Sequence, residues 1–144
     1  MTTAELKAKV NEQIERQKED IIGVAREILL TPELGFREFK TAAITARKFA
    51  ELGLPCRDRI AFTGVKAVAN AGAPGPSICI RGELDSLVSP DHAFADPKTG
   101  AAHVCGHNGQ VAIMYGVAAA LLRSDVLPFL AGRLVFIGIP AADY

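Results

Sequence analysis

The order of the elements in the second half of the chain restricts the fold more than any other feature. Residues 77 to 83 and 133 to 139 have the apolar, β-type composition of strands, and a helical pattern runs from Asn108 to about Ser124. A strand, a crossover that contains a helix and a second strand form a unit in which the two strands are parallel. We therefore expect an α/β fold with both strands in one sheet.

The first half of the chain predicts two helices. Apolar residues form one helical stripe from Leu6 to Ile28, and Thr2 and Glu5 have the spacing of a capping box. A second helix is expected over residues 39 to 52, with Gly53 as the residue that ends it.

Two connections between the expected strands carry further information. Residues 65 to 69 form another β-type run, and the turn-rich segment 70 to 76 joins it to the strand 77 to 83, so we expect these strands to be neighbours. Residues 86 to 107 form a connection of about twenty residues, which compact domains usually contain only when the loop has a function. Asn108 can cap the helix that follows this connection.

Composition excludes several classes of protein. Sixteen basic and sixteen acidic residues cancel, without a long run of one sign, which argues against a nucleic-acid partner. The longest nearly apolar run, Val111 to Leu122, is shorter than the roughly 18 residues of a membrane span, so we expect no membrane protein. The polar amino terminus lacks the pattern of a secretion signal, and three cysteines suit a reducing compartment. These features predict a cytoplasmic protein.

The segment His103 to Gly109 contains the strongest local signal for chemistry. Two of the three histidines and one cysteine lie within five residues, directly before a predicted helix. Thiolate and imidazole are metal ligands, and Gly106 allows the backbone to turn so that Cys105 and His107 face one point. The segment therefore predicts a metal site.

Other interpretations of these residues remain open. A buried cysteine and a structural histidine are common in protein cores. Cys105 and His107 could also form a nucleophilic pair, although a spacing of two residues seldom lets the base approach the sulfur. A structural zinc site would need four ligands, and no second pair of ligands with suitable spacing occurs. A metal-free nucleotide-binding domain has little support, because residues 72 to 75 form a proline-containing turn.

Acidic residues follow both strands of the expected crossover unit. Glu83 and Asp85 lie at the end of the first strand, and Asp143 follows the second. Each alone is read most simply as a solvated strand end or a cap. In α/β sheets, however, ligands bind at the carboxyl ends of the strands, where Asp85, Cys105, His107 and Asp143 would then meet.

Four motifs, in this order, resemble those of a known enzyme family. They are residues 31 to 36 (TPELGF), 81 to 87 (RGELDSL), 103 to 107 (HVCGH) and 140 to 143 (PAAD). The chain resembles, from about residue 20 to 144, the metal-dependent amidohydrolases and carboxypeptidases of bacteria and plants. This family includes indole-acetyl-amino-acid hydrolases, aminobenzoyl-glutamate hydrolases and aminoacylases.

The resemblance implies a particular domain organisation. The family's catalytic domain is a three-layer, helix–sheet–helix, zinc-peptidase-like α/β fold with a mostly parallel mixed sheet. Residues 1–144 would form its amino-terminal part, without the rest of the catalytic domain and without the lid domain through which these proteins form homo-oligomers.

The resemblance also implies roles for individual residues. Cys105 and His107 match ligands of one or two divalent ions, manganese or zinc, and Asp143 lies where a ligand glutamate is expected. Asp85 matches an acidic residue that orients a ligand. Such enzymes use a metal-activated water to cleave a carbon–nitrogen bond, here of an N-acyl amino acid, an aminobenzoyl conjugate or a related aromatic amine. Cys105, His107 and Asp143 are at most three ligands, one fewer than a closed site contains.

The chain departs from the family pattern at three positions. Asn108 and Gln110 replace an aspartate and a histidine, and Ala142 occupies the position of the general-base glutamate. Losing a general base typically lowers the rate by a factor of about 10² to 10⁴. Impaired catalysis is therefore expected, and the alternative function is a catalytically inactive metal-binding or assembly fragment.

Overall fold

Three α-helices and six strands follow one another along the residues that the computed structural model describes, 1–70 and 72–144. The helices are α1 (Thr3–Leu29), α2 (Phe39–Glu51) and α3 (His107–Arg123), with a short 3-10 helix at Leu127–Phe129. The strands are β1 (Arg57–Ile60), β2 (Gly64–Ala69), β3 (Ser77–Glu83), β4 (Leu87–Val88), β5 (Ala101–Ala102) and β6 (Arg133–Ile139).

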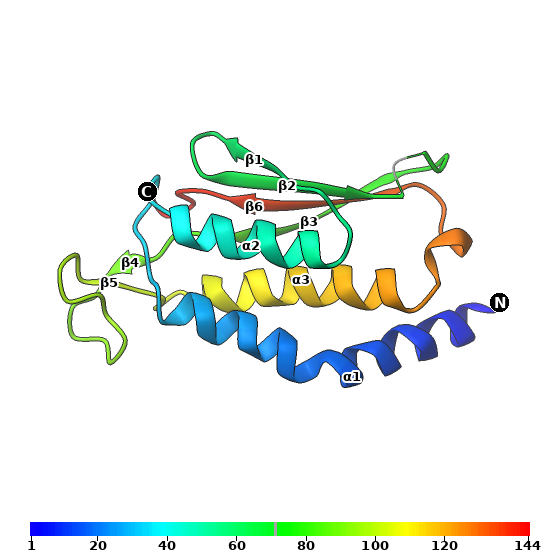
Figure 1. Ribbon diagram of the computed structural model, residues 1–144, viewed down its shortest axis with the longest axis horizontal. Helices are drawn as coiled ribbons and strands as arrows, with labels where there is room; N and C mark the ends of the chain where they lie inside the picture. The colour runs from blue at the N-terminus through cyan, green and yellow to red at the C-terminus, as the bar shows by residue number, and fades with distance from the viewer. Residues whose placement is uncertain (71) are drawn as a thin grey trace.

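Four of the strands form a mixed sheet in the order β1–β2–β6–β3 (Figure 1). β3 and β6 are parallel, in a register that runs from Ser77 opposite Arg133 to Glu83 opposite Ile139. β2 is antiparallel to β6, and β1 is antiparallel to β2. The expected α/β fold with a mixed sheet, and the parallel pairing across the helical crossover, are therefore confirmed.

The prediction that β2 and β3 are neighbours is wrong, because β6 lies between them. Two residues between β2 and β3, Asn70 and Pro74, form hydrogen bonds to Gly132, which directly precedes β6. The Asn70 side chain donates to the carbonyl of Gly132 at 2.9 Å, and the Gly132 nitrogen donates to Pro74 at 2.8 Å. These bonds hold Asn70 and Pro74 beside the beginning of β6, and β2 and β3 do not pair as a hairpin.

All three helices lie on the same side of the sheet (Figure 1). α2 and α3 pack against the strands, and α1 packs along α3. Within the described residues one helical layer thus covers the sheet directly, and one of its three strand pairings is parallel. The second helical layer of the expected three-layer fold is not among these residues.

The core lies between the sheet and the helices. Phe49 of α2 packs against Phe136 of β6 with ring centroids 5.5 Å apart, and both side chains are fully buried. Burial of one such side chain contributes about 1.5–3 kcal/mol to stability. The side chains that share this core on the other elements are Val24, Ile28, Leu84, Val111, Met114 and Tyr115.

Gly82 allows α3 to approach the end of β3 closely. A methyl group at this position would lie 3.1 Å from the Cα and nitrogen atoms of Val111, which is tighter than ordinary contact distance. The absence of a side chain at Gly82 therefore brings the first turn of α3 next to the carboxyl end of β3.

The helix ends follow from local sequence. Thr2 and Glu5 form the predicted capping box at the start of α1. Glu33, which the sequence analysis did not single out, accepts hydrogen bonds from the backbone nitrogen atoms of Lys40 and Thr41 at 3.0 and 2.9 Å. These bonds satisfy donors that are otherwise free in the first turn of α2. Gly53 follows α2 with a φ of +76°, as predicted for a terminating glycine.

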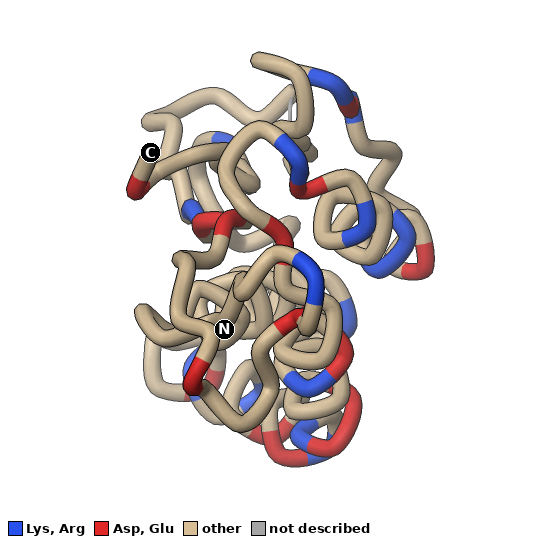
Figure 2. The backbone as a smooth tube through the Cα atoms, turned by 90° about the vertical axis from the view of Figure 1, so that its left-hand side faces the viewer, with Lys and Arg blue, Asp and Glu red and all other residues tan. Residues whose placement is uncertain are grey.

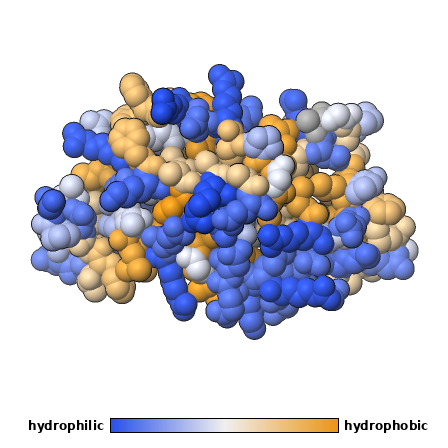
Figure 3. Space-filling view, in the orientation of Figure 1, coloured by the Kyte–Doolittle hydropathy of each residue, from blue (hydrophilic) through white to orange (hydrophobic). Residues whose placement is uncertain are grey.

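The amino-terminal half of α1 is more exposed than its apolar stripe suggested. Ile14 is 39% exposed, whereas Val24 and Ile28 in the second half are buried. Figure 3 shows hydrophilic residues along the lower part of the molecule, where α1 lies. None of the helices in residues 1–70 and 72–144 is both long and apolar enough to span a lipid bilayer.

Candidate metal centre

The residues expected to form a metal site meet at one edge of the sheet. Asp85 follows β3, Asp143 follows β6, and Cys105 and His107 lie at the start of α3. The carboxyl ends of β3 and β6 and the start of α3 lie on the same side of the molecule (Figure 1). One possible ligand atom from each of Cys105, His107 and Asp143 lies within 4.8 Å of the others. The topology thus brings together side chains separated by up to 38 positions, from Cys105 to Asp143.

Gly106 makes the turn that aims Cys105 and His107 at the same point. It has a φ of +76°, in the left-handed region that glycine adopts without strain, and it is the N-cap of α3. The expected capping role of Asn108 is wrong, because this residue already lies inside the helix. Its side-chain nitrogen donates to the carbonyl of Ala25 at 3.1 Å and so ties α3 to α1.

Hydrogen bonding fixes the orientation of the buried His107 ring. Nδ1 lies 2.8 Å from the backbone oxygen of Asp85 and 3.2 Å from its Oδ1. Both partners are acceptors, so Nδ1 carries the hydrogen and Nε2 is left with a lone pair in the neutral ring. This is the tautomer in which a metal-ligating histidine is held by a carboxylate or a carbonyl oxygen.

The free nitrogen of His107 faces two carboxylates. Nε2 lies 2.9 Å from Oε2 of Glu83 and 3.4 Å from Oδ2 of Asp143. Three acceptors that converge in this way repel one another unless a proton or a cation lies between them. The arrangement therefore fits a bound cation.

Asp85 connects two of the candidate ligands. Its side chain is 2% exposed, and its Oδ2 accepts a hydrogen bond from the backbone nitrogen of Asp143 at 2.9 Å. Its backbone oxygen accepts the hydrogen bond from His107 Nδ1, so Asp85 contacts both candidate ligands, while its buried Oδ1 has no hydrogen-bond partner among the described residues. The orienting role that the family resemblance implies for Asp85 stays a prediction.

Cys105 and Asp143 are the exposed members of the cluster. The pKa of the Cys105 thiol is raised above its ordinary value by desolvation first, and then by a hydrogen bond to Asp143 and by the negative charges of neighbouring carboxylates. The same negative field attracts a cation. A thiolate, an imidazole and a carboxylate together form a donor set suited to zinc and similar divalent ions.

Ala142 lies in the turn after β6 and is exposed. It follows Ala141, whose φ of +50° is unusual for a residue other than glycine. The Ala142 methyl group can neither accept nor donate a proton. Where the family resemblance placed a general base, the structure therefore presents an inert side chain.

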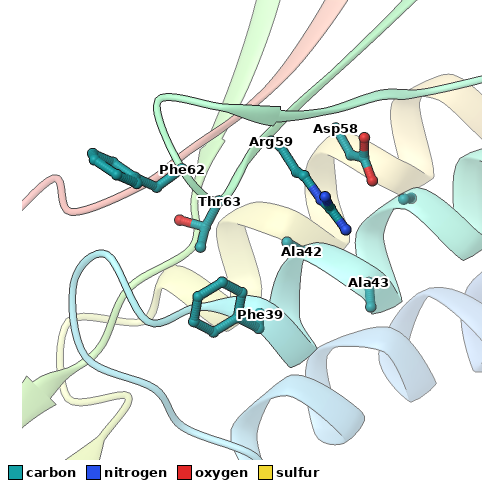
Figure 4. A pocket seen from close by; sticks show the side chains of 8 residues that line it. Phe39, Ala42, Ala43, Asp58, Arg59, Phe62 and Thr63 are labelled. Atoms are coloured by element: carbon teal, nitrogen blue, oxygen red, sulfur yellow. The ribbon is translucent and has the colours of Figure 1, made fainter.

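A pocket of about 210 Å³ adjoins the cluster. Its walls include Asp85 and Asp143 of the cluster, together with the side chains of Leu34, Leu87, Val88 and Tyr144. A second pocket, of about 200 Å³, lies between α2 and the β1–β2 hairpin and contains none of the predicted site residues (Figure 4).

Three polar residues of this region were not predicted as part of the site. Glu83 contacts His107, as described above, and Gln110 donates to the Glu83 carboxylate at 3.2 Å. His103 is 6% exposed, and among the described residues neither of its ring nitrogens has a hydrogen-bond partner. Burial lowers the pKa of His103 to about 4, and repulsion from His107 adds to this shift.

Comparisons with known proteins give relatives of the chain in sequence and in fold. No family model matches the chain. A Bacillus subtilis (strain 168) protein named as an amidohydrolase, YhaA, is 33% identical over the whole chain, which covers 37% of that protein. The N-acyl-L-amino acid amidohydrolase of Geobacillus stearothermophilus is 33% identical over 88% of the chain and 34% of its own length.

Two solved structures have the same fold. The Bacillus subtilis YxeP protein, described as a dinuclear metal binding peptidase from the M20 family, superposes with a TM-score of 0.78 and 29% identity, over 90% of this chain and 37% of that one. A protein of methicillin-resistant Staphylococcus aureus named as an aminohydrolase superposes with a TM-score of 0.80 and 26% identity, over 92% of this chain and 34% of that one.

These similarities define the class of fold, which is that of the M20 peptidases. Over nearly its whole length, the chain is similar to part of proteins named as amidohydrolases and carboxypeptidases, as its four motifs predicted. The chain spans about a third of the length of the relatives it matches.

Proposed function

We propose that residues 1–144 form the amino-terminal part of the catalytic domain of a metal-dependent hydrolase that cleaves carbon–nitrogen bonds. The main observation in support of this proposal is that one possible ligand atom of each of Cys105, His107 and Asp143 lies within 4.8 Å of the others, at the carboxyl edge of the sheet. Because the chain spans about a third of its relatives, the rest of the catalytic domain and a lid domain that forms the homo-oligomer would lie outside these residues.

In this proposal Cys105, His107 and Asp143 hold one or two divalent ions, manganese or zinc. Such an ion, when bound, lowers the pKa of a water molecule and polarises the amide carbonyl. Asp85 orients His107 through Nδ1 and holds the backbone of Asp143, so that both ligands face the same point. A divalent ion is supported by the description of YxeP as a dinuclear metal binding peptidase.

The proposed substrate is a small amide: an N-acyl amino acid, an aminobenzoyl conjugate or a related aromatic amine. Relatives named N-acetyl-L-cysteine deacetylase and N-acyl-L-amino acid amidohydrolase support this class. The pocket beside Asp143 supports it as well, because its apolar walls, Leu34, Leu87 and Val88, can contact an acyl group while the carbonyl lies at the cluster.

A second candidate function follows from Ala142. Because this residue supplies no proton acceptor, a protein with the same metal ligands could bind a cation without hydrolysing an amide. The second candidate is therefore a catalytically inactive metal-binding or assembly protein.

We also propose that the protein acts in the cytoplasm on small molecules. Cys56, Cys79 and Cys105 are free thiols, which suits a reducing compartment. Basic and acidic residues are interspersed in Figure 2, a distribution that supports a small-molecule substrate over nucleic acid.

The experiment that tests the proposal uses the protein at its full encoded length, stripped of metal by a chelator and reloaded with manganese or zinc. Release of amine is measured for a panel of N-acyl amino acids and aminobenzoyl conjugates. Hydrolysis that depends on added metal supports the enzyme, and stoichiometric metal without hydrolysis supports the inactive candidate. Absence of metal binding contradicts both.

A matched pair of cysteine variants shows whether the cluster is the metal site. Cys105 and Cys79 are both exposed thiols, but only Cys105 lies in the cluster. The Cys105→Ser variant should lose metal, whereas the Cys79→Ser variant should keep it. Equal metal content in the two variants would place the metal elsewhere.

A further inference from the structure

Glu83 is the last residue of β3, and its carboxylate points into the cluster. Its Oε2 lies 2.9 Å from Nε2 of His107, closer than the 3.4 Å of the Asp143 oxygen. The Glu83 side chain is 16% exposed, against 39% for Asp143. Glu83 is thus the more buried of the two carboxylates that face this nitrogen.

The spacing of these atoms suits ligands of one ion. Two ligand atoms that each lie about 2.1 Å from an ion are about 3.0 Å apart at a right angle and about 3.4 Å apart at the tetrahedral angle. The separations of 2.9 and 3.4 Å from His107 Nε2 match these values. Each of the two oxygens therefore lies at a distance from the histidine nitrogen that suits ligands of one ion.

Gln110 holds Glu83 by its backbone and by its side chain. The Gln110 Oε1 accepts a hydrogen bond from the Glu83 nitrogen at 3.1 Å, and its Nε2 donates to Glu83 Oε2 at 3.2 Å. One amide group thereby fixes both the end of β3 and the direction of the carboxylate. A third contact of this carboxylate, to the largely exposed Arg81, is longer, at 3.6 Å.

We propose that Glu83 is a further oxygen donor to the cation centre and that Gln110 is its positioning residue. The inference rests on the proposed metal centre and raises its donors in this chain from three to four, the number that a closed site contains. Glu83 has no role in the site that the sequence motifs predicted.

An alternative explanation of the contact between Glu83 and His107 predicts the opposite effect on cation affinity. If Glu83 only paired with a protonated His107, the carboxylate would stabilise a proton on the nitrogen that a cation must occupy. Removal of the Glu83 charge would then ease cation binding. If Glu83 is a donor, the same change weakens cation binding.

The test is calorimetric titration of the chelator-treated protein with zinc and with cobalt(II). We expect Glu83→Gln to raise Kd by at least about tenfold, and Gln110→Leu to raise it by about tenfold, in the range seen when orienting partners of ligands are removed. Glu83→Asp, which keeps the charge with a shorter reach, should lie between Glu83→Gln and the wild type. The control is Glu19→Gln, an exposed carboxylate on α1 that should leave Kd unchanged.

The absorption spectrum of bound cobalt gives a second readout. Loss of the Glu83 oxygen should change the d–d bands, while the thiolate-to-cobalt band of Cys105 persists. An unchanged or lower Kd with an unchanged spectrum in Glu83→Gln would overturn the inference and leave the proposed metal centre intact. If the wild type binds no cation, both the inference and the proposed function fail. Thermal unfolding of each variant verifies that it is folded.

Discussion

The buried carboxylate of Glu38 accepts a hydrogen bond from the backbone nitrogen of Ala141 at 2.7 Å, across 103 residues of sequence. Its other oxygen accepts from the hydroxyl of Thr63 at 2.6 Å. Ala141 has a left-handed φ of +50°, a conformation that costs energy for a residue with a side chain. Glu38 therefore stabilises the turn that carries Asp143 to the cluster.

This bond predicts a difference between two substitutions of Glu38. Glu38→Leu leaves the part-buried Ala141 nitrogen and the buried Thr63 hydroxyl without their acceptor, and should lower the free energy of unfolding by about 1–3 kcal/mol. Glu38→Gln should cost less, because its carbonyl oxygen can still accept from Ala141 and its amide can donate to Thr63. Denaturant unfolding measures both, and equal losses would show that the bond to Ala141 contributes nothing specific.

Replacing Ala142 by glutamate should restore a proton acceptor to the centre. In the full-length, metal-loaded protein, Ala142→Glu should raise turnover by about two orders of magnitude or more, with metal content unchanged. Turnover on an N-acyl amino acid and metal analysis on the same preparation decide the outcome. If both forms turn over equally, the position has no such role, and Asp143 or another carboxylate becomes the candidate base.

Asp85 should matter to metal binding although it is not among the proposed ligands. Asp85→Asn keeps the size of the side chain but removes the charge beside Nδ1 of His107, and should weaken cation affinity by about 10- to 100-fold. The exposed Asp91 provides the control as Asp91→Asn. Calorimetry that gave the same affinity for both variants would contradict the orienting role of Asp85.

Alanine substitutions at two glycines near the centre should change the stability of the protein in opposite directions. Gly82→Ala would bring a methyl group to 3.1 Å from Val111, and should destabilise the protein by about 1–3 kcal/mol. Gly109→Ala meets no atom within 4 Å and lies in a helix, so it should stabilise the protein by up to about 1 kcal/mol. Thermal or denaturant unfolding of the pair measures both changes, and a Gly82→Ala variant as stable as the wild type would contradict the predicted effect of the close approach.

His103 predicts a pH dependence of stability in the metal-free protein. Its pKa is lowered from 6.5 to about 4 in the folded state, chiefly by burial. Between these values the unfolded chain binds more protons, so the free energy of unfolding falls as pH drops from about 6.5 to about 4. Urea unfolding at pH 7 and pH 4.5 should show a smaller loss in His103→Phe than in the wild type. The control variant His92→Gln should lose as much as the wild type.

The sequence predicted the crossover unit because its signals were local. The apolar runs of β3 and β6 and the helical pattern of α3 each identify one element, and chain connectivity then fixes the parallel pairing. The position of β6 between β2 and β3 is not a local property. It depends on contacts such as that of Asn70 with Gly132, which are 62 residues apart.

Local sequence signals also predicted part of the cluster, namely Asp85, Cys105, His107 and Asp143. Glycine between cysteine and histidine is a short-range pattern, and the acidic residues follow strands whose carboxyl ends must coincide. Glu83 was noticed as a strand end but not as a partner of His107, although alternation along a strand places it on the same side as Asp85. Glu38 gave no signal, since a fully buried carboxylate is recognised only when its partners are known.

The parallel register of β3 and β6 makes the centre depend on residue counts. Glu83 lies opposite Ile139 in the sheet. Asp85 comes two residues after Glu83 and Asp143 comes four residues after Ile139, and these two distances along the chain bring both side chains to the cluster. Replacing a side chain leaves these counts intact, as Ala142 illustrates between Ala141 and Asp143. Adding or removing one residue in either strand would turn the following side chains to the opposite face. During evolution, substitutions can therefore add or remove a catalytic or ligand group at this centre. Insertions or deletions in these two strands would instead separate the ligands from one another.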